Sequence, residues 1–176
     1  MIKFYLEPGY DVKKPEREFG NAGIDFFIPN YTDTFATAFN AKNVMENANL
    51  FFNEELGWHI YITPHGRANI PSGVRSRISS NIALEAQNKS GVATKHGLVY
   101  GASTVDASYT GIIHLSLINS TKNEVRLPLG SKIVQFIPRL IDTSDIEICD
   151  DMTLAAFYED FEFSNRGEGA FGSTGV

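Results

Sequence analysis

Asp106 and Tyr109, an acid and an aromatic ring at a polar bend, are the first side chains of this sequence that could do chemistry. They lie within residues 97–119, where two apolar runs flank the bend. In the second run, residues 113–118, apolar side chains recur at every second position, which is typical of a strand with one buried face. We therefore expect a β-hairpin with a carboxylate at its turn. Asp is also an ordinary turn former, so turn formation alone explains Asp106 as well.

Residues 88–96, NKSGVATKH, form a second stretch suited to chemistry. A short helical turn is predicted over 91–95. Backbone N–H groups at the start of such a turn, with Lys89 and Ser90 beside them, suit a phosphate oxyanion. Taken alone, the same residues are also typical of an ordinary loop.

The sequence ends with RGEGAFGSTGV at 166–176, which has four glycines in eleven residues. So much glycine predicts a flexible tail without a ligand. Arg166, Ser173 and Thr174 could wrap a phosphate while Phe171 covers a base. A purely solvated tail is the alternative, although it has no need of Phe171.

Asp25 and Gln135 are polar residues within apolar runs. Burial of an acid is costly unless a hydrogen bond or a cation compensates for the lost water. Asp25 therefore either stabilises a turn or faces a metal-bound ligand. Gln135 lies on a predicted strand, 132–139.

Composition limits the class of protein. The 176 residues are most simply one domain with a formal net charge of −6, which argues against binding to duplex nucleic acid. A single cysteine, Cys149, and no apolar leader at the start favour a reducing, cytosol-like compartment. Sequons at Asn30, Asn88 and Asn119 are then chance matches. No stretch reaches the roughly 18 apolar residues that a membrane span needs.

Many short strands separated by Gly, Pro, Asn and Ser turns predict an all-β barrel or sandwich. Besides the hairpin, the predicted strands are 2–6, 58–63, 69–71, 75–78, 82–87, 124–127, 132–139 and 146–149. Apolar residues over 154–161 indicate a helical turn or a docking arm.

Residues 31–56 differ from the rest because they are rich in Asn and Phe. Apolar residues near helical spacing, with Asn43 and Glu46 as a cap pair, predict a helix over about 43–56. We interpret 31–56 as an insertion. Its apolar stripe suits core packing or, alternatively, a site for a protein partner.

Taken together, these stretches resemble the trimeric dUTPase family, which carries five ordered motifs. The matching sequences are AGID at 22–25, NKSGVATKHG at 88–97, TVDASYTG at 104–111, GSKIVQF at 130–136 and RGEGAFGSTG at 166–175. The order and approximate spacing are kept across nearly the whole chain. The fifth motif is the most specific of them and the first is the weakest.

The resemblance implies a compact, jelly-roll-like β-barrel domain over 1–163, with a helical insertion at 31–56. The flexible Gly-rich tail, 164–176, would close over the active site. It further implies a cytoplasmic homotrimer, in the host cytoplasm if the source is viral, whose active sites are shared between subunits. The implied reaction is Mg2+-dependent hydrolysis of dUTP to dUMP and pyrophosphate, which keeps uracil out of DNA and supplies dUMP for thymidylate synthesis.

The resemblance also assigns roles to residues. Asp106 would be the base that activates water, and Asp25 would meet Mg2+ through water. Tyr109 would pack on the sugar, residues 97–103 would line the base, and Phe171 would stack over uracil. Substrate contacts are implied at Lys89, Ser90, Gly91, Gly101, Thr104, Val105, Tyr109, Gln135, Arg166, Phe171, Gly172, Ser173 and Thr174.

Several positions depart from the family pattern. Lys89 stands in place of the common Arg and exchanges a planar fork for a point charge. Asn88 replaces a usual proline, Ser108 a common aspartate, Ile112 a frequent acid and Ala170 a frequent glycine. Two rival functions stay open: deamination of dCTP on the same fold, and a nucleotide-gated protein-binding regulator that uses 31–56.

Overall fold

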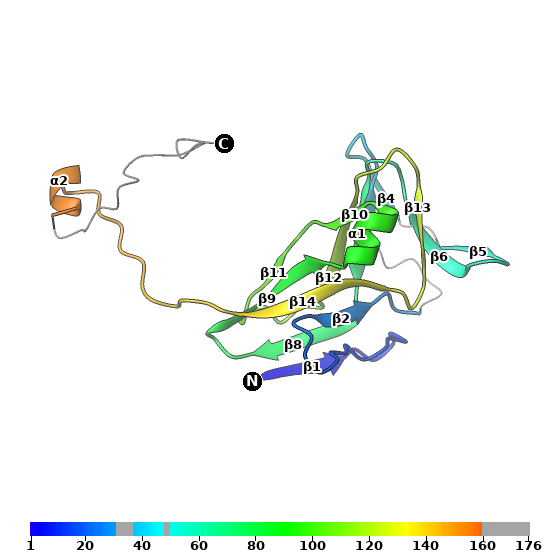
Figure 1. Ribbon diagram of the computed structural model, residues 1–176, viewed down its shortest axis with the longest axis horizontal. Coiled ribbons are helices and arrows are strands. Elements are labelled where there is room, and N and C mark those ends of the chain that lie inside the picture. The colour runs from blue at the N-terminus through cyan, green and yellow to red at the C-terminus, as the bar shows by residue number, and fades with distance from the viewer. Residues whose placement is uncertain (31–36, 48–49, 160–176) are drawn as a thin grey trace. The chain divides into compact units, whose positions relative to one another are not determined.

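The structure, a computed structural model, describes residues 1–30, 37–47 and 50–159. The chain divides into two compact units, Met1–Thr143 and Ser144–Val176. The first unit holds fourteen strands and one short helix, and the described part of the second holds one helical turn (Figure 1). The all-β class predicted from the sequence is confirmed.

The elements follow one another along the chain with short connections. They are β1 (Ile2–Leu6), β2 (Ile24–Phe27), β3 (Thr37–Phe39), β4 (Met45–Asn47), β5 (Leu50–Asn53), β6 (Gly57–Ile62), β7 (Arg67–Pro71), β8 (Val74–Ile78), β9 (Ile82–Asn88), α1 (Ser90–His96), β10 (Leu98–Tyr100), β11 (Thr104–Val105), β12 (His114–Asn119), β13 (Val125–Pro128), β14 (Lys132–Leu140) and α2 (Leu154–Phe157).

Every strand pair among the described residues is antiparallel. The strands form four ladders, in the orders β1-β8, β10-β12-β7-β3-β4, β11-β9-β14-β2 and β13-β6-β5. Neighbours in these ladders are often far apart in sequence, as expected when a chain crosses repeatedly between packed sheets. The predicted central hairpin is present, because β10 pairs with β12 from Leu98↔Asn119 to Tyr100↔Leu117.

The core forms where the apolar faces of these ladders meet. Leu115 and Leu117 on β12 are buried, whereas His114 and Ile118 on the same strand are exposed, as the alternation in sequence predicts. The rings of Phe26 on β2 and Phe136 on β14 pack edge to face with their centroids 4.8 Å apart. The sheet that carries Asp25 and Gln135 is thereby anchored on one face.

A buried amide holds the end of the hairpin in place. The side chain of Asn119 is fully buried, and its Nδ2 lies 2.8–3.1 Å from the carbonyl oxygens of Ile62, Thr63 and Asn123. Its Oδ1 accepts hydrogen bonds from both the backbone N–H and the hydroxyl of Thr121. Asn119 therefore satisfies several buried polar groups at once.

The predicted helix over 43–56 is wrong. The structure has β4 and β5 there, and β5 pairs with β6 as a hairpin. The sequence signal failed because Asn43 has a positive φ of 62° in a tight turn, where Asn40 Oδ1 accepts from Val44 N–H at 3.1 Å. Asn tolerates that conformation in turns and so does not begin a helix here. Phe52 is also 62% exposed, so the spacing of apolar residues does not define a buried stripe.

The predicted strand over 146–149 is also absent. This stretch has the apolar alternation of a strand, yet Ile146 and Ile148 are 90% and 82% exposed and no strand of the described chain pairs with it. A strand needs a partner for its backbone hydrogen bonds. The helical turn expected nearby is present as α2, capped by the Thr153 side chain, which accepts from Ala156 N–H. Within the described residues, no helix has the length and apolar character needed to cross a bilayer.

Candidate active site

A depression of about 390 Å³ lies beside α1 and collects several of the predicted phosphate contacts. Its lining consists of Lys89, Ser90, Gly91, Val92, Lys95, His96 and Gln135. The helical turn expected over 91–95 is confirmed as α1, which ends at Gly97 in the left-handed conformation with φ 62°. Glycine permits that sharp ending without steric cost. The chain can therefore turn directly from the depression into β10.

Gln135 is positioned by two neighbouring strands. On β14 it lies opposite Asp25 of β2 on one side and opposite Gln87 of β9 on the other. Its Nε2 donates to the backbone oxygen of Asn88 at 3.0 Å. Gly23 leaves space for this amide, since a Cβ at Gly23 would lie 2.1 Å from Gln135 Oε1. The strand register thus directs Gln135 to the start of the α1 loop.

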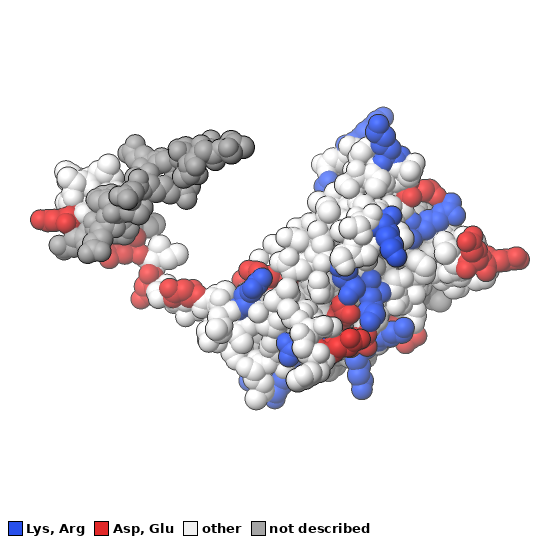
Figure 2. Space-filling model, in the orientation of Figure 1, with Lys and Arg blue, Asp and Glu red and all other residues white. Residues whose placement is uncertain are grey.

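Asp25 lies in a network of charges rather than alone. Its Oδ1 is 2.5 Å from Lys89 Nζ and its Oδ2 is 3.5 Å from Lys132 Nζ, while its side chain is 19% exposed. The pKa of Lys132 is raised, mainly because its ammonium donates to Glu16 at 2.8 Å, with Asp25 adding to the effect. Lys132 therefore stays charged at neutral pH. Figure 2 shows basic and acidic side chains intermixed over β2 and β14.

The bend after β11 presents Asp106 to solvent. Val105 is buried and pairs with Leu84 of β9, and Asp106 follows it as an exposed residue. Tyr109 N–H donates to Asp106 O at 3.1 Å, which closes the turn between them. The Tyr109 hydroxyl donates to Ile112 O at 2.9 Å. The predicted acid and aromatic residue are thus held in one tight bend.

The same bend is fixed at its far side by Arg75 on β8. Its Nη1 donates to Thr110 O at 2.7 Å and its Nε to Glu7 at 2.6 Å. The hydrogen bond to Glu7 is the main reason that the pKa of Arg75 is raised. Gly111 allows the Tyr109 ring to lie close, because a Cβ there would be 2.4 Å from its hydroxyl oxygen.

The structure does not bring all predicted residues into one depression. Asp106 lines a separate hollow of about 500 Å³ with Ile78, Ser80, Ala107, Ser108 and Ile141. That hollow and the depression beside α1 have no lining residue in common. The remaining predicted contacts, Arg166, Phe171, Gly172, Ser173 and Thr174, lie outside the described residues.

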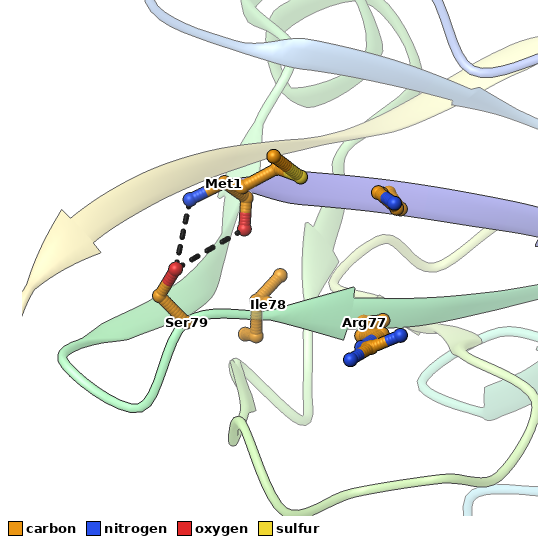
Figure 3. A pocket seen from close by; sticks show the side chains of 5 residues that line it. Met1, Arg77, Ile78 and Ser79 are labelled. Carbon is orange, nitrogen blue, oxygen red and sulfur yellow. Dashed lines mark hydrogen bonds between the residues drawn. The ribbon is translucent and has the colours of Figure 1, made fainter.

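Another hollow lies where β1 meets the end of β8, and it contains none of the predicted site residues. It has a volume of about 280 Å³ and is lined by Met1, Lys3, Arg77, Ile78 and Ser79. Figure 3 shows the Ser79 hydroxyl bonded to both the nitrogen and the oxygen of Met1. These bonds fasten the first strand to the fold.

Sequence reasoning missed several residues that shape the site. Gly23 and Lys132 lie within the matched motif regions but were given no role, although glycine beside an apolar run often marks a close approach. Asn88 was noted only as a departure from proline. Its side-chain bond to the Tyr100 backbone, 2.9 Å long, depends on a contact that spacing does not reveal.

Comparison with solved structures defines the class of fold. A mutant dUTPase of Staphylococcus bacteriophage 80alpha, solved with dUpNHpp, superposes with a TM-score of 0.72 at 19% identity, covering 100% of this chain and 99% of that one. A mutant dUTPase of phage phi11 of S. aureus, described with a structural Mg(II) ion, gives a TM-score of 0.63 at 16% identity over 86% of this chain and 98% of that one. The chain therefore has the dUTPase fold.

Sequence comparison goes further. The dUTPase family profile matches residues 57–175. The deoxyuridine 5'-triphosphate nucleotidohydrolase of Oryza sativa subsp. japonica is 31% identical over 117 residues, which are 66% of this chain and 63% of that protein. The enzyme of the same name from Candida glabrata is 29% identical over 65% of this chain and 75% of its own length. The chain belongs to the dUTPase family.

Proposed function

We propose that this protein hydrolyses dUTP to dUMP and pyrophosphate. The observation that carries the proposal is the grouping of Lys89, Ser90 and Gln135 around one depression, in a chain of the dUTPase family. A cation, a hydroxyl and an amide are suitable donors for a polyphosphate. The relatives named above are nucleotidohydrolases of the same nucleotide.

Asp106 acts as the base in the proposed reaction. Water is a poor nucleophile at neutral pH, so a carboxylate within hydrogen-bond reach must orient it and accept its proton. The oxygen of this water attacks the α-phosphorus, and the bond from that phosphorus to the bridging oxygen breaks, so pyrophosphate leaves. Exposure of Asp106 suits this role, because the carboxylate is free to meet a substrate from outside its own bend.

The phosphates bind beside α1 in this scheme. Lys89 and Gln135 neutralise and hold phosphate oxygens, and Ser90 lies near the leaving-group oxygen. Fixed donors of this kind stabilise the charge that develops on the departing pyrophosphate. Gly91 keeps the loop open to the ligand, since a Cβ there would meet nothing within 4 Å.

The sugar and base bind along the hairpin. Tyr109 packs on the deoxyribose so that a ribose 2′-hydroxyl does not fit. Gly101 lets a ligand approach the backbone, because its own Cβ position is already occupied 2.7 Å away by Ser116 Oγ. Thr104 and Val105 place the turn at the end of β11. Phe171 from the C-terminal segment covers the base, and Arg166, Gly172, Ser173 and Thr174 complete the phosphate contacts.

Mg2+ enters with the nucleotide in our proposal. Among the described residues there is no group of three His, Cys, Asp or Glu side chains that could hold a metal. Asp25, the predicted contact, is paired with Lys89 and Lys132, which suits a contact through water better than direct binding. Mg2+ on the phosphates would lower the charge that repels the attacking water.

A homotrimer with shared active sites completes the proposal. Asp106 and the Lys89–Gln135 depression line different hollows of one chain, which suits a site assembled from different copies. Exposed apolar residues such as Leu140, 81% exposed, offer surface for assembly. Analytical ultracentrifugation at several protein concentrations would test this assignment, and a monomer at all concentrations would exclude it.

The activity test is pyrophosphate release from a panel of deoxynucleoside triphosphates with and without Mg2+. We expect release from dUTP that greatly exceeds release from dCTP and dTTP, and that depends on Mg2+. Ammonia release from dCTP without pyrophosphate from dUTP would instead indicate a deaminase. No turnover of any nucleotide, together with tight dUTP binding, would favour a regulatory protein.

One observation favours a second function as a nucleotide-gated binding protein. The β5–β6 hairpin exposes Phe51, Phe52 and Trp58 by 42%, 62% and 48%, and the rings of Phe52 and Trp58 pack together at 5.6 Å. Acidic side chains gather at the far end of this hairpin in Figure 2, where Glu54 and Glu55 lie in the turn. An apolar face with an acidic rim suits a protein partner with a basic rim. A Phe52→Ser, Trp58→Ser variant that loses a partner but keeps dUTP turnover would separate the two functions.

A further inference from the structure

Asn88 makes two hydrogen bonds that lead in different directions. It is the last residue of β9, and its side-chain Oδ1 accepts from the backbone N–H of Tyr100 at 2.9 Å. Its backbone oxygen accepts from Gln135 Nε2 at 3.0 Å. One residue thus contacts both the phosphate-side amide and the strand that follows α1.

The side-chain bond closes the loop that contains α1. Tyr100 lies twelve residues after Asn88, at the end of β10, and α1 lies between them in the chain (Figure 1). β9 and β10 belong to different ladders, and β10 is the edge strand of its own. The next residue, Gly101, donates its N–H to Ser116 O on β12 at 2.9 Å. The Tyr100 N–H points to the other side of β10, as alternating N–H directions in a strand require, and meets Asn88 there.

The two ends of this bond lie at two parts of the proposed site. Lys89 and Ser90 follow Asn88 directly and line the depression beside α1. Tyr100 lies within 97–103, the stretch proposed to read the base. A shift of the phosphate loop therefore moves the acceptor that holds the base-side backbone.

We infer that Asn88 is a positioning residue that couples phosphate binding beside α1 to the placement of the base-reading backbone at Tyr100 and Gly101. The inference rests on the proposed function for its ligand, and on the two hydrogen bonds for its geometry. A proline at position 88, as in the family pattern, has no side-chain acceptor and cannot make this connection. Coupling through Asn88 is thus a property of this chain's own residue.

Amide-resolved hydrogen exchange tests the connection without any turnover. In Asn88→Leu, which has a similar shape but no acceptor, the Tyr100 amide should exchange about tenfold faster, because one stabilising bond is lost. Asn88→Asp retains an oxygen at Oδ1 and should restore slow exchange. The matched control is Thr94→Val, which removes the bond from the Thr94 hydroxyl to Ser90 O inside α1 and should leave Tyr100 unchanged. Equal Tyr100 exchange in wild type and Asn88→Leu would overturn the inference.

Inorganic pyrophosphate tests the coupling. It should slow exchange at Tyr100 and Gly101 in the wild type but not in Asn88→Leu, although both proteins still bind it through Lys89. Equal slowing in both proteins would show that Asn88 transmits nothing. These results stand even if the protein turns over no dUTP, so a failure of the proposed function remains distinguishable.

The kinetic test applies to the active protein. Asn88→Leu should raise the KM for dUTP about 2- to 10-fold, the worth of one hydrogen bond, and should weaken discrimination against dCTP. The kcat should change little, because Asp106 is not touched by the bond. Asn88→Asp should recover both KM and selectivity. A fall in kcat alone, at unchanged KM and selectivity, would contradict a positioning role.

Discussion

Lys89 Nζ lies 2.5 Å from Asp25 Oδ1, so the cation that faces the proposed phosphate site is already paired with an acid. The two side chains are only 25% and 19% exposed. A phosphate that binds Lys89 must compete with this carboxylate. The ion pair therefore sets how strongly the depression attracts anions.

Replacing Asp25 tests that competition. Without Mg2+, Asp25→Asn should bind pyrophosphate about two- to fivefold more tightly than the wild type, because Lys89 loses its competing partner. With Mg2+ the gain should shrink, since the carboxylate that meets the ion through water is gone. Isothermal titration calorimetry in both buffers measures the difference, and weaker binding without Mg2+ would contradict the competition.

Asp106→Asn removes the proposed base and keeps its size. We expect kcat for dUTP to fall by about 10²- to 10⁴-fold, the usual contribution of a general base. Substrate affinity and oligomeric state should persist, because Asp106 is exposed and lies outside the core. Stopped-flow pyrophosphate release and ultracentrifugation check the two parts, and normal turnover would remove Asp106 from the mechanism.

Gly23→Ala should disturb Gln135 directly. The new Cβ would lie 2.1 Å from Gln135 Oε1, so the amide must leave its place and lose its bond to Asn88 O. We expect kcat/KM to fall about fivefold or more, the worth of a hydrogen bond. Adding Gln135→Ala to Gly23→Ala should restore the melting temperature by relieving the clash, but not the activity. Recovery of activity in the double variant would show that Gln135 contributes nothing.

Deleting residues 167–176 should leave the fold intact and strongly reduce turnover. The prediction rests on the sequence, because a segment so rich in glycine can add little to a core. Circular dichroism should be unchanged, whereas pyrophosphate release should fall. If the shortened chain kept full activity, the C-terminal motif would have no part in the reaction.

Asn119→Leu should destabilise the protein by about 2–4 kcal/mol, because it leaves buried carbonyl oxygens without their donor. Urea denaturation measures the free energy of unfolding. Asn69→Leu provides the control, since Asn69 is exposed on β7 beside the same sheet and should change stability by less than about 0.5 kcal/mol. Equal effects of the two changes would argue against the role of the buried amide.

The sequence predicted the strands of the first unit well because their buried faces follow a simple alternation, as on β12. It failed over 43–56 because Asn43 has one meaning at a helix start and another in a left-handed turn, and only the pairing of β5 with β6 decides between them. It failed over 146–149 because alternation predicts an extended chain but cannot supply a partner strand.

For the site, motif order predicted which residues matter but not what holds them. Lys89, Ser90, Gly91 and Gln135 do share one depression, as their assigned roles require. The link from Asp25 to Lys132, with Glu16 beyond it, depends on strand register and long-range packing. Such contacts leave no local pattern in a single sequence.

The burial of Asn119 also bears on how this protein can be produced. Asn119 begins an Asn-Ser-Thr sequon, and its amide is enclosed once β12 is in place. An oligosaccharide attached to that nitrogen during export would occupy the position that three carbonyl oxygens require. In a eukaryotic secretory host, glycosylation at Asn119 and folding of the sheets would exclude each other, so the yield of native protein would depend on which occurred first.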